Sequence, residues 1–453
     1  MSYAEFVHGK AIRSIATGIT PDEPPSMLFP FQRDIVKWAL RRGRAAIFAD
    51  CGLGKTPMQL SWAAQIPGKV LILAPLAVSH QTVREGAKFG IDLEYSRHPI
   101  DAHITITNYE MLDHFNPKDY TGIVLDESSI LKSYDGKFRN QIVDSFLDTP
   151  FKLACTATPA PNDHMELGNH AEFLGVLSRT EMLSTFFVHD GGDTSKWRLK
   201  GHASSDFWKW MCSWAVMIRK PSDLGYEDGK FTLPPMEMHQ TIVESMSTPE
   251  GALFAMEATT LQERQQARKG TTQERCQAVA DIVATKPDEP WLIWCNLNDE
   301  SQTVKAMIPG AVEVTGSDSI ESKESRMLGF TRGEHSIMVS KPSICGFGMN
   351  WQHCANVVFL GLSDSYEQFY QAIRRCWRFG QAREVNCWIV TSDIEGAVVA
   401  NIKRKENDSA RMAEEMVSHM HDMNSEDIRG AVRTDDGYSP KVEMIIPKWL
   451  EAA

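Results

Sequence analysis

Short, mostly apolar runs recur along this chain and alternate with segments long enough to form helices. Runs of this kind occupy residues 45–49, 70–74, 103–107, 123–125 and 152–155, and again residues 291–295, 337–339, 357–360 and 387–390. Most are continuously apolar rather than alternating, which is typical of strands covered on both faces. The sequence therefore predicts parallel sheets with crossover helices, in an α/β fold with two lobes.

The two groups of runs are separated by a segment of different character. After Pro161 the apolar runs stop and the chain becomes rich in tryptophan until the double proline at 234–235, which interrupts both helix and sheet. We expect a first lobe at 1–233 with a helical insertion at about 165–230, and a second lobe at 234–395. We expect a polar helix and a tail at 396–453. A length of 453 residues is enough for two lobes, one insertion and this C-terminal part.

Charge and cysteine content narrow the class of protein. There are 47 Lys and Arg against 59 Asp and Glu, a net charge of −12, and nine cysteines without a C-x-x-C pair. Free thiols of this kind are typical of a reducing compartment. The longest apolar stretch, 70–78, is far shorter than the roughly 20 residues that span a bilayer. We expect an intracellular, cytoplasmic protein that does not bind a membrane. Because the net charge is negative, the chain would bind a polyanion only through a local track of basic residues.

A phosphate-binding loop follows the first apolar run. The segment 49–56 reads ADCGLGKT, a Walker A pattern with alanine at its first position. Gly52 and Gly54 allow backbone amides to close on phosphate oxygens, Lys55 would reach the β and γ phosphates, and Thr56 would bind Mg²⁺. The loop predicts an ATP site, because it lies between a strand and a helix-length segment.

Two acids end a later apolar run, in the sequence GIVLDE at 122–127. Asp126 would hold Mg²⁺ through water, and Glu127 would orient and deprotonate an attacking water. The adjacent glutamate favours hydrolysis over phosphate transfer to a substrate. Together with the Walker loop, the pair predicts an ATP hydrolase that uses Mg²⁺.

These motifs and their order resemble superfamily 2 helicases, specifically the Swi/Snf-like double-stranded DNA translocases. LFPFQ at 28–32 is similar to the Q motif, whose Gln32 would read the adenine edge. Segments 73–76 and 107–110 resemble motifs Ia and Ib, which puts Pro75, Thr107 and Asn108 on the nucleic-acid side. TATP at 156–159 resembles motif III, which gives Thr156 and Thr158 a coupling role.

The second lobe carries the most specific part of this resemblance. GFGMN at 346–350 is similar to motif V, with Gly348 on the nucleotide and Asn350 on the DNA side. QAIRRCWRFGQ at 371–381 matches the Swi/Snf-like motif VI at its fixed positions, beginning with the coupling residue Gln371. The three-residue spacing of Arg375 and Arg378 predicts one face of a helix, from which both would act as arginine fingers on the γ-phosphate.

The chain departs from the family pattern at a few positions. The DExx box reads DESS, so Ser129 stands where aspartate or histidine usually connects hydrolysis to motif III. Ser363-Asp364-Ser365 replaces a Trp-Asn-Pro, and Cys345 replaces a glycine. These changes leave ATP binding intact and bear on the coupling of hydrolysis to nucleic-acid movement.

The resemblance implies two RecA-like lobes that close on ATP and Mg²⁺ and step along duplex DNA, with a C-terminal helical brace. Compact phage and prophage members are the nearest in type, which implies a role in phage-type DNA replication, recombination or repair, in a bacterial host cell. Two alternatives stay open: an ATP-switched clamp on DNA or protein without translocation, and an RNA-directed unwinding helicase. We expect a monomer.

The segment between the lobes leaves its own alternatives. Phe207, Trp210, Met211 and Trp214 follow helical spacing, and the core of a helical hairpin is favoured over a duplex-gripping wedge. The apolar end of the tail, 444–450, would dock on the body or bind a protein partner. No histidine or cysteine spacing predicts a metal site besides Mg²⁺.

Overall fold

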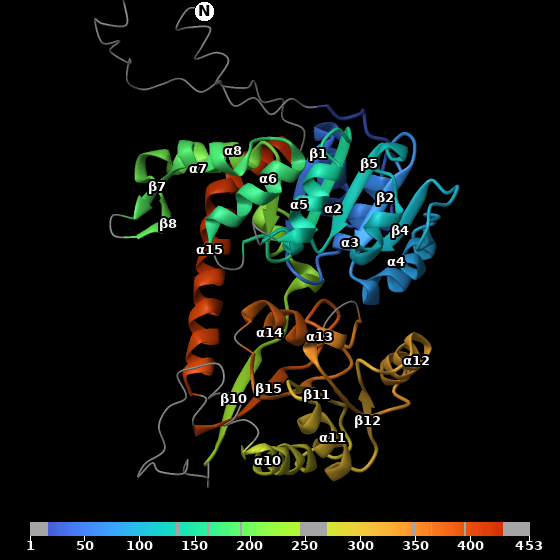
Figure 1. Ribbon diagram of the computed structural model, residues 1–453, viewed down its shortest axis with the longest axis vertical. Helices are drawn as coiled ribbons and strands as arrows, with labels where there is room; N and C mark the ends of the chain where they lie inside the picture. The colour runs from blue at the N-terminus through green and yellow to red at the C-terminus, as the bar shows by residue number, and fades with distance from the viewer. Residues whose placement is uncertain are drawn as a thin grey trace, which may run out of the picture.

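The computed structural model describes residues 17–132, 136–160, 163–190, 193–244, 270–345, 349–363, 365–393 and 396–428. In these ranges the chain forms two parallel β-sheets with helices packed on them, one sheet above the other in Figure 1. The fold class predicted from the apolar runs is therefore confirmed. The tail at 444–450 lies outside the described residues.

The first lobe is built on a seven-stranded parallel sheet in the order β3-β4-β2-β5-β6-β1-β9. Its strands are β1 (Arg44–Ala49), β2 (Val70–Ala74), β3 (Glu94–Tyr95), β4 (Ile104–Asn108), β5 (Gly122–Asp126), β6 (Phe151–Thr156) and β9 (Ala215–Ile218). The helices of this part are α2 (Pro30–Arg42), α3 (Lys55–Ala63), α4 (Leu76–Lys88), α5 (Lys137–Ser145), α6 (Leu167–Leu174), α7 (Arg179–Phe186) and α8 (Ser204–Cys212).

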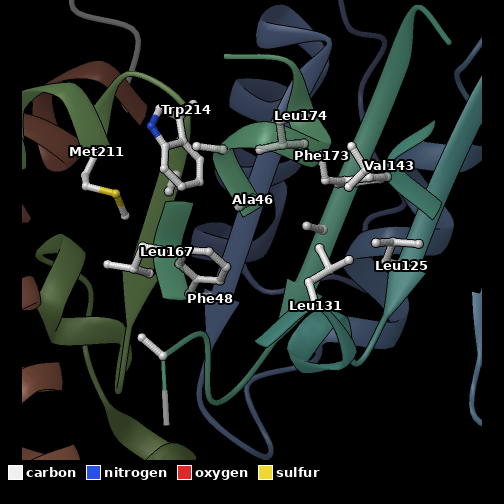
Figure 2. Packing of buried hydrophobic residues seen from close by; sticks show 14 of the residues in the cluster. Ala46, Phe48, Leu125, Leu131, Val143, Leu167, Phe173, Leu174, Met211 and Trp214 are labelled. Carbon is white, nitrogen blue, oxygen red and sulfur yellow. The ribbon is translucent and has the colours of Figure 1, made fainter. Parts of the chain in front are cut away.

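Both faces of this sheet are covered, as the continuous apolar runs require. Along β1, Ala46 and Phe48 pack into one hydrophobic cluster, while Ala45 and Ile47 pack into another on the opposite face. Figure 2 shows the first cluster, in which Phe48 lies near Leu167 of α6 and Trp214, which follows α8. The five residues of β1 that follow Arg44 are fully buried, so this strand places the Walker loop on a rigid support.

The tryptophan-rich segment belongs to the body of the first lobe. Phe207, Trp210, Met211 and Trp214 are at most 6% exposed, so the core interpretation is correct and a wedge on these four residues is not available. The segment also differs from a purely helical insertion. It contains the antiparallel hairpin of β7 (Phe187–Asp190) and β8 (Asp193–Leu199), and it returns β9 to the edge of the sheet beside β1.

The second lobe has a six-stranded parallel sheet in the order β10-β15-β14-β11-β13-β12. Its strands are β10 (Met236–Val243), β11 (Trp291–Cys295), β12 (Ala311–Val314), β13 (Ile337–Ser340), β14 (Asn356–Leu360) and β15 (Val385–Ser392). Its helices are α10 (Thr272–Ala284), α11 (Asn298–Met307), α12 (Ile320–Thr331), α13 (Pro342–Cys345) and α14 (Tyr366–Ile373). In Figure 1, α13 and α14 lie at the boundary with the first lobe.

Helix α15 (Gly396–Ile428) connects the two lobes along one side of the molecule (Figure 1). Its first turns bury Val398 and Ile402 in the core of the second lobe, and Met416 is buried in the core of the first. Arg219 pairs with Glu414 of α15 at 3.0 Å. The helix therefore braces the lobes, as the sequence predicted. None of the helices among the described residues is long and apolar enough to cross a membrane.

One buried lysine in the first lobe gives a test of this fold. Lys152 of β6 is fully buried, and its ammonium donates to the carbonyl oxygens of Leu147 (3.1 Å) and Phe173 (2.9 Å). Burial, and secondarily the charge of Arg44, lowers the pKa of Lys152 from 10.5 to about 7. Between about pH 7 and 10 the unfolded chain therefore binds more protons at this residue, and the residue makes stability rise with pH.

We expect the native chain to gain stability relative to Lys152→Met as the pH rises, so the unfolding free energy of the native chain minus that of the variant should increase with pH. Below pH 7 the native lysine carries its full desolvation penalty. Above that pH its relative stability rises by at most about 1.4 kcal/mol per pH unit. Urea denaturation of both chains at pH 6, 7, 8 and 9 measures this difference. Lys69→Met, at a lysine whose side chain is 40% exposed, is the control. A pH-independent difference would show that Lys152 is not protonated differently in the folded state.

Candidate active site at the lobe interface

The Walker loop has the backbone conformation that its glycines allow. Gly52 and Gly54 have φ values of +90° and +82°, in the left-handed region that other residues rarely adopt. A Cβ atom on Gly54 would clash with the side chain of Gln32, and one on Gly52 would lie 2.9 Å from the backbone nitrogen of Phe379 in the second lobe. The loop thus needs glycine for its own shape and for the approach of motif VI.

The side chains expected at the nucleotide lie around this loop. The Lys55 ammonium donates to the carbonyl oxygen of Ala49 at 2.8 Å, so it rests on its own loop. Thr56 is half-buried in the first turn of α3. The amide nitrogen of Gln32 donates to the carbonyl of Leu53 at 2.8 Å. Gln32 therefore holds the Walker loop to the start of α2, in addition to any contact with a base.

The two carboxylates at the end of β5 have different environments. Asp126 is buried, and burial, followed by the charge of Glu127, raises its pKa to about 6. Glu127 is half-buried and has a φ of +61°, the one left-handed non-glycine residue among the described ranges. Its Oε1 atom accepts hydrogen bonds from Thr156 (2.7 Å) and Ser129 (3.2 Å). These bonds hold the strained residue in one orientation.

The contacts of Ser129 show how motif III reaches the DESS box. Thr156 of motif III and Ser129 donate to the same oxygen of Glu127, and the backbone nitrogen of Thr158 donates to the hydroxyl of Thr156 at 3.1 Å. Ser129 therefore contacts the Glu127 carboxylate directly, instead of bridging to motif III itself. The connection from Thr158 to Glu127 is complete without the usual aspartate or histidine.

The two arginines of motif VI do not share a helix, which corrects the sequence-based prediction. Helix α14 ends at Ile373, and the chain continues in tight turns in which the amides of Arg375 and Cys376 bond to carbonyls three residues earlier. Both arginines lie in these turns, which end at Gly380 with a φ of +91°. The i to i−3 bonds tighten the chain and end the regular helix.

The environments of the two arginines also differ. The Arg375 guanidinium donates to the carbonyl oxygens of Gln371 (2.9 Å) and Met349 (3.4 Å) in its own lobe. Among the described residues, the side chain of Arg378 has no hydrogen bond or ion pair. Burial, followed by the charge of Arg375, lowers the pKa of Arg378 to about 10. A guanidinium in this setting is suited to bind an anion.

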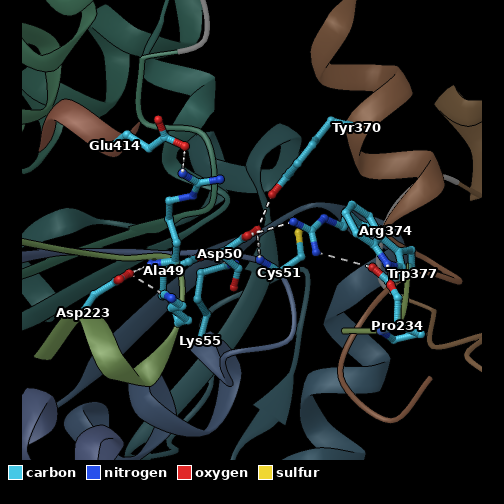
Figure 3. A network of polar contacts seen from close by, with 12 residues as sticks. Ala49, Asp50, Cys51, Lys55, Asp223, Pro234, Tyr370, Arg374, Trp377 and Glu414 are labelled. Atoms are coloured by element: carbon cyan, nitrogen blue, oxygen red, sulfur yellow. Dashed lines mark hydrogen bonds and ion pairs between the residues drawn. The ribbon is translucent and has the colours of Figure 1, made fainter. Parts of the chain in front are cut away.

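A third arginine, which the sequence-based reasoning missed, makes the direct contact between the lobes. Arg374 pairs with Asp50 of the Walker loop at 2.8 Å, and Tyr370 donates its hydroxyl to the same carboxylate (Figure 3). Burial is the largest single influence and lowers the pKa of Arg374, but the charges of Asp50, Tyr370 and Cys51 together outweigh it, and the net shift is upward. The signal in the sequence was the spacing of Tyr370, directly before motif VI, and Arg374 within it, one helical turn apart.

The residues expected on the DNA side are not gathered in one place. Pro75 and Gln371 line a cavity of about 680 Å³ between the lobes, together with Glu127. Thr107 and Asn108 of β4 are buried, because β2 and β3 flank this strand and helices cover the faces of the sheet. Neither residue is exposed for a contact with DNA. Asn350 is half-buried, and its Oδ1 has no partner among the described residues. Gly348 lies outside the described residues.

Basic and acidic side chains meet across the same cavity. Arg84 of the first lobe pairs with Glu324 of the second at 2.6 Å, and Lys132 pairs with Glu367. The cavity is therefore lined by both charges, and its basic groups from the first lobe already have partners in the second.

Comparison with known proteins agrees with this architecture. Residues 274–380 match the helicase conserved C-terminal domain, a range that includes β11 to β14, α14 and all three arginines. The second lobe therefore contains a helicase conserved C-terminal domain. The DNA annealing helicase and endonuclease ZRANB3 of Mus musculus is 25% identical over 177 residues, which are 34% of this chain and 16% of the mouse protein.

A solved structure is also similar to this chain. The Sulfolobus solfataricus SWI2/SNF2 ATPase core in complex with dsDNA aligns with a TM-score of 0.42 and 16% identity, over 90% of this chain and 98% of that one. The chain matches only a small part of the length of ZRANB3, and it has the helicase C-terminal domain in its second lobe.

Proposed function

We propose that this helicase-type chain hydrolyses ATP between its lobes and uses the cycle to move along duplex DNA. The supporting observation is the arrangement of motif VI against the Walker loop. A Cβ atom at Gly52 would lie 2.9 Å from the nitrogen of Phe379, the residue that follows Arg378. A phosphate chain on the loop would therefore meet a cationic group from the other lobe, which is the arrangement that phosphoryl transfer requires.

The described residues fit ATP and Mg²⁺. The loop from Gly52 to Thr56 offers backbone amides and the Lys55 ammonium to the phosphates, and Arg378 offers a guanidinium without another partner. Thr56 and Asp126 supply the hydroxyl and carboxylate oxygens that Mg²⁺ prefers. Bound there, Mg²⁺ would neutralise charge on the phosphates and favour the ionised form of Asp126.

In this scheme Glu127 takes a proton from the attacking water, and the arginines stabilise the charge that develops on the γ-phosphate. ATP would favour the closed lobes, because Lys55 holds it from one side and Arg378 from the other. Hydrolysis removes that bridge. Thr156 donates to Glu127, which itself lines the interlobe cavity, and this contact would link hydrolysis to lobe movement.

Duplex DNA is proposed as the track because basic groups from both lobes line the interlobe cavity. Arg84 and Lys132 of the first lobe and Lys323 of the second lie there. DNA phosphates would compete with Glu324 and Glu367 for the first two, so binding would be of modest affinity and steeply dependent on salt. The word helicase in the name of ZRANB3 agrees with a nucleic-acid substrate.

The proposal predicts that duplex DNA raises the steady-state ATPase rate at least several-fold. The rate is measured with Mg²⁺ and saturating ATP in the presence of duplex DNA, single-stranded DNA or RNA at the same nucleotide concentration. Lys55→Ala is the background control, because it removes the ammonium above the Walker loop. Equal rates with all three polymers would contradict a DNA motor, and stimulation by RNA alone would favour the unwinding helicase.

A clamp without translocation remains the second candidate, because α15 is anchored in both lobes and limits how far they separate. Displacement of a third strand from a DNA triplex distinguishes the two. A motor releases that strand only with ATP present. A clamp binds the duplex and leaves the third strand in place.

A further inference from the structure

Helix α14 presents one polar stripe to the first lobe. Glu367, Tyr370, Gln371 and Arg374 follow at i, i+3, i+4 and i+7, which is one face of a helix and its C-cap. Glu367 pairs with Lys132, Tyr370 and Arg374 contact Asp50, and Gln371 lines the interlobe cavity. This stripe therefore joins the Walker loop of one lobe to the arginines of the other.

Both oxygens of the Asp50 carboxylate accept hydrogen bonds. Its Oδ1 atom accepts from the backbone nitrogen of Cys51 (2.5 Å) and from the hydroxyl of Tyr370, and its Oδ2 atom accepts from Arg374 (2.8 Å). The side chains of Arg374 and Asp50 are 8% and 17% exposed, so the ion pair is poorly screened by water. Asp50 thus shapes its own loop and holds motif VI at once.

Arg374 also lies over two aromatic rings. Its guanidinium lies 5.1 Å from the ring centroid of Tyr370 and 4.5 Å from that of Trp377. The indole nitrogen of Trp377 donates to the carbonyl of Pro234, in the double proline before β10, at 2.8 Å (Figure 3). The Arg374 guanidinium is therefore packed against a side chain that is bonded to the segment linking the lobes, in addition to its ion pair with Asp50.

We propose that Asp50, Tyr370 and Arg374 form an interlobe clasp that positions Arg375 and Arg378 opposite the Walker loop. The clasp and the finger arginines share one turn of chain, and Arg374 directly precedes Arg375. None of the three clasp residues is assigned a contact with the phosphates, so they are positioning residues. The inference rests on the proposed function, because the positioned groups act on ATP.

The charge of Asp50 gives the clasp a second consequence. A carboxylate in a phosphate-binding loop repels ATP unless a cation neutralises it, and Arg374 is that cation. Loss of Arg374 therefore leaves an unpaired negative charge beside the phosphates and also releases the finger arginines. Loss of the Asp50 charge releases the fingers alone.

These two consequences separate in a double-mutant cycle of ATPase kinetics. Arg374→Ala should lower kcat and raise KM for ATP, each about tenfold, whereas Asp50→Asn should lower kcat about tenfold without raising KM. The double variant should return KM to within about twofold of the native value while kcat stays low. Arg374→Lys should restore KM better than kcat, because an ammonium keeps the charge but loses the planar contacts with the rings of Tyr370 and Trp377. Arg383→Ala, which removes an ion pair inside the second lobe, is the matched control and should change neither constant.

A KM that stays high in the double variant would overturn the proposal, because a merely structural defect gives that result. So would a kcat within twofold of the native value in both single variants. Hydrogen exchange of the amides of residues 50–54 without nucleotide tests the clasp independently of ATP. Asp50→Asn and Arg374→Ala should both speed that exchange at least tenfold, and unchanged exchange would overturn the clasp. If the native chain hydrolyses no ATP, the proposed function fails, and the exchange experiment still decides whether the clasp exists.

Discussion

Replacing Arg378 with alanine should lower kcat for ATP about 10³-fold while changing ATP binding far less. The guanidinium is partly buried at the lobe interface without a hydrogen bond or ion pair among the described residues. Its pKa is lowered to about 10, first by burial and then by Arg375. A γ-phosphate supplies the missing counter-charge, and that interaction strengthens as negative charge develops in the transition state.

The measurement combines steady-state ATPase kinetics with equilibrium binding of a fluorescent ATP analogue. Arg404→Ala removes an arginine from an exposed ion pair on α15 and is the matched control. Arg375 is a less clean test, because its guanidinium bonds to two carbonyls of its own lobe and its loss would also disturb the turn. A drop in kcat of less than tenfold in Arg378→Ala would show that this arginine is not the finger.

Replacing Glu127 with glutamine should lower the hydrolysis rate by about 10²- to 10⁴-fold and preserve ATP binding. The amide keeps the size of the side chain and an oxygen that can accept from Thr156 and Ser129. It cannot take a proton from water. The chain should therefore fold and bind ATP but accumulate in the ATP-bound state.

Single-turnover hydrolysis with excess enzyme separates this chemical step from binding and product release. Glu110→Gln is the matched control, because Glu110 lines the same interlobe cavity and accepts a hydrogen bond from Asn108 at 2.6 Å, away from Glu127. If Glu127→Gln retained more than a tenth of the native single-turnover rate, another group would have to act as the base.

Local patterns were sufficient for the parts of this molecule that depend on neighbouring residues. The apolar run before the Walker loop became β1, and Gly52 and Gly54 have the left-handed conformations that the loop needs. Phe207 and Trp214 lie in the core, as their helical spacing favoured. The identities of the nucleotide residues stay predictions until the kinetic variants are measured.

Other features depend on contacts that a local pattern does not contain. The spacing of Arg375 and Arg378 suggested one helical face, but tight turns after Ile373 end α14 before either residue. Thr107 matched a motif on the nucleic-acid side, yet the strands beside β4 and the helices over the sheet bury it. β9 joined the first sheet from within a segment that the sequence presented as helical.

The sequence by itself determined that two parallel-sheet lobes carry a phosphate loop, a pair of carboxylates and an arginine motif, because each of these follows from residue types at fixed spacing. Only the tertiary structure decided which side chains meet across the lobes. Asp50 and Arg374 lie 324 positions apart, and their ion pair exists because the two sheets place the Walker loop and the end of α14 at one interface. The same packing tied the Arg375 guanidinium to carbonyls of its own lobe and left the Arg378 guanidinium without a bond among the described residues, since burial and partners are properties of the assembled fold.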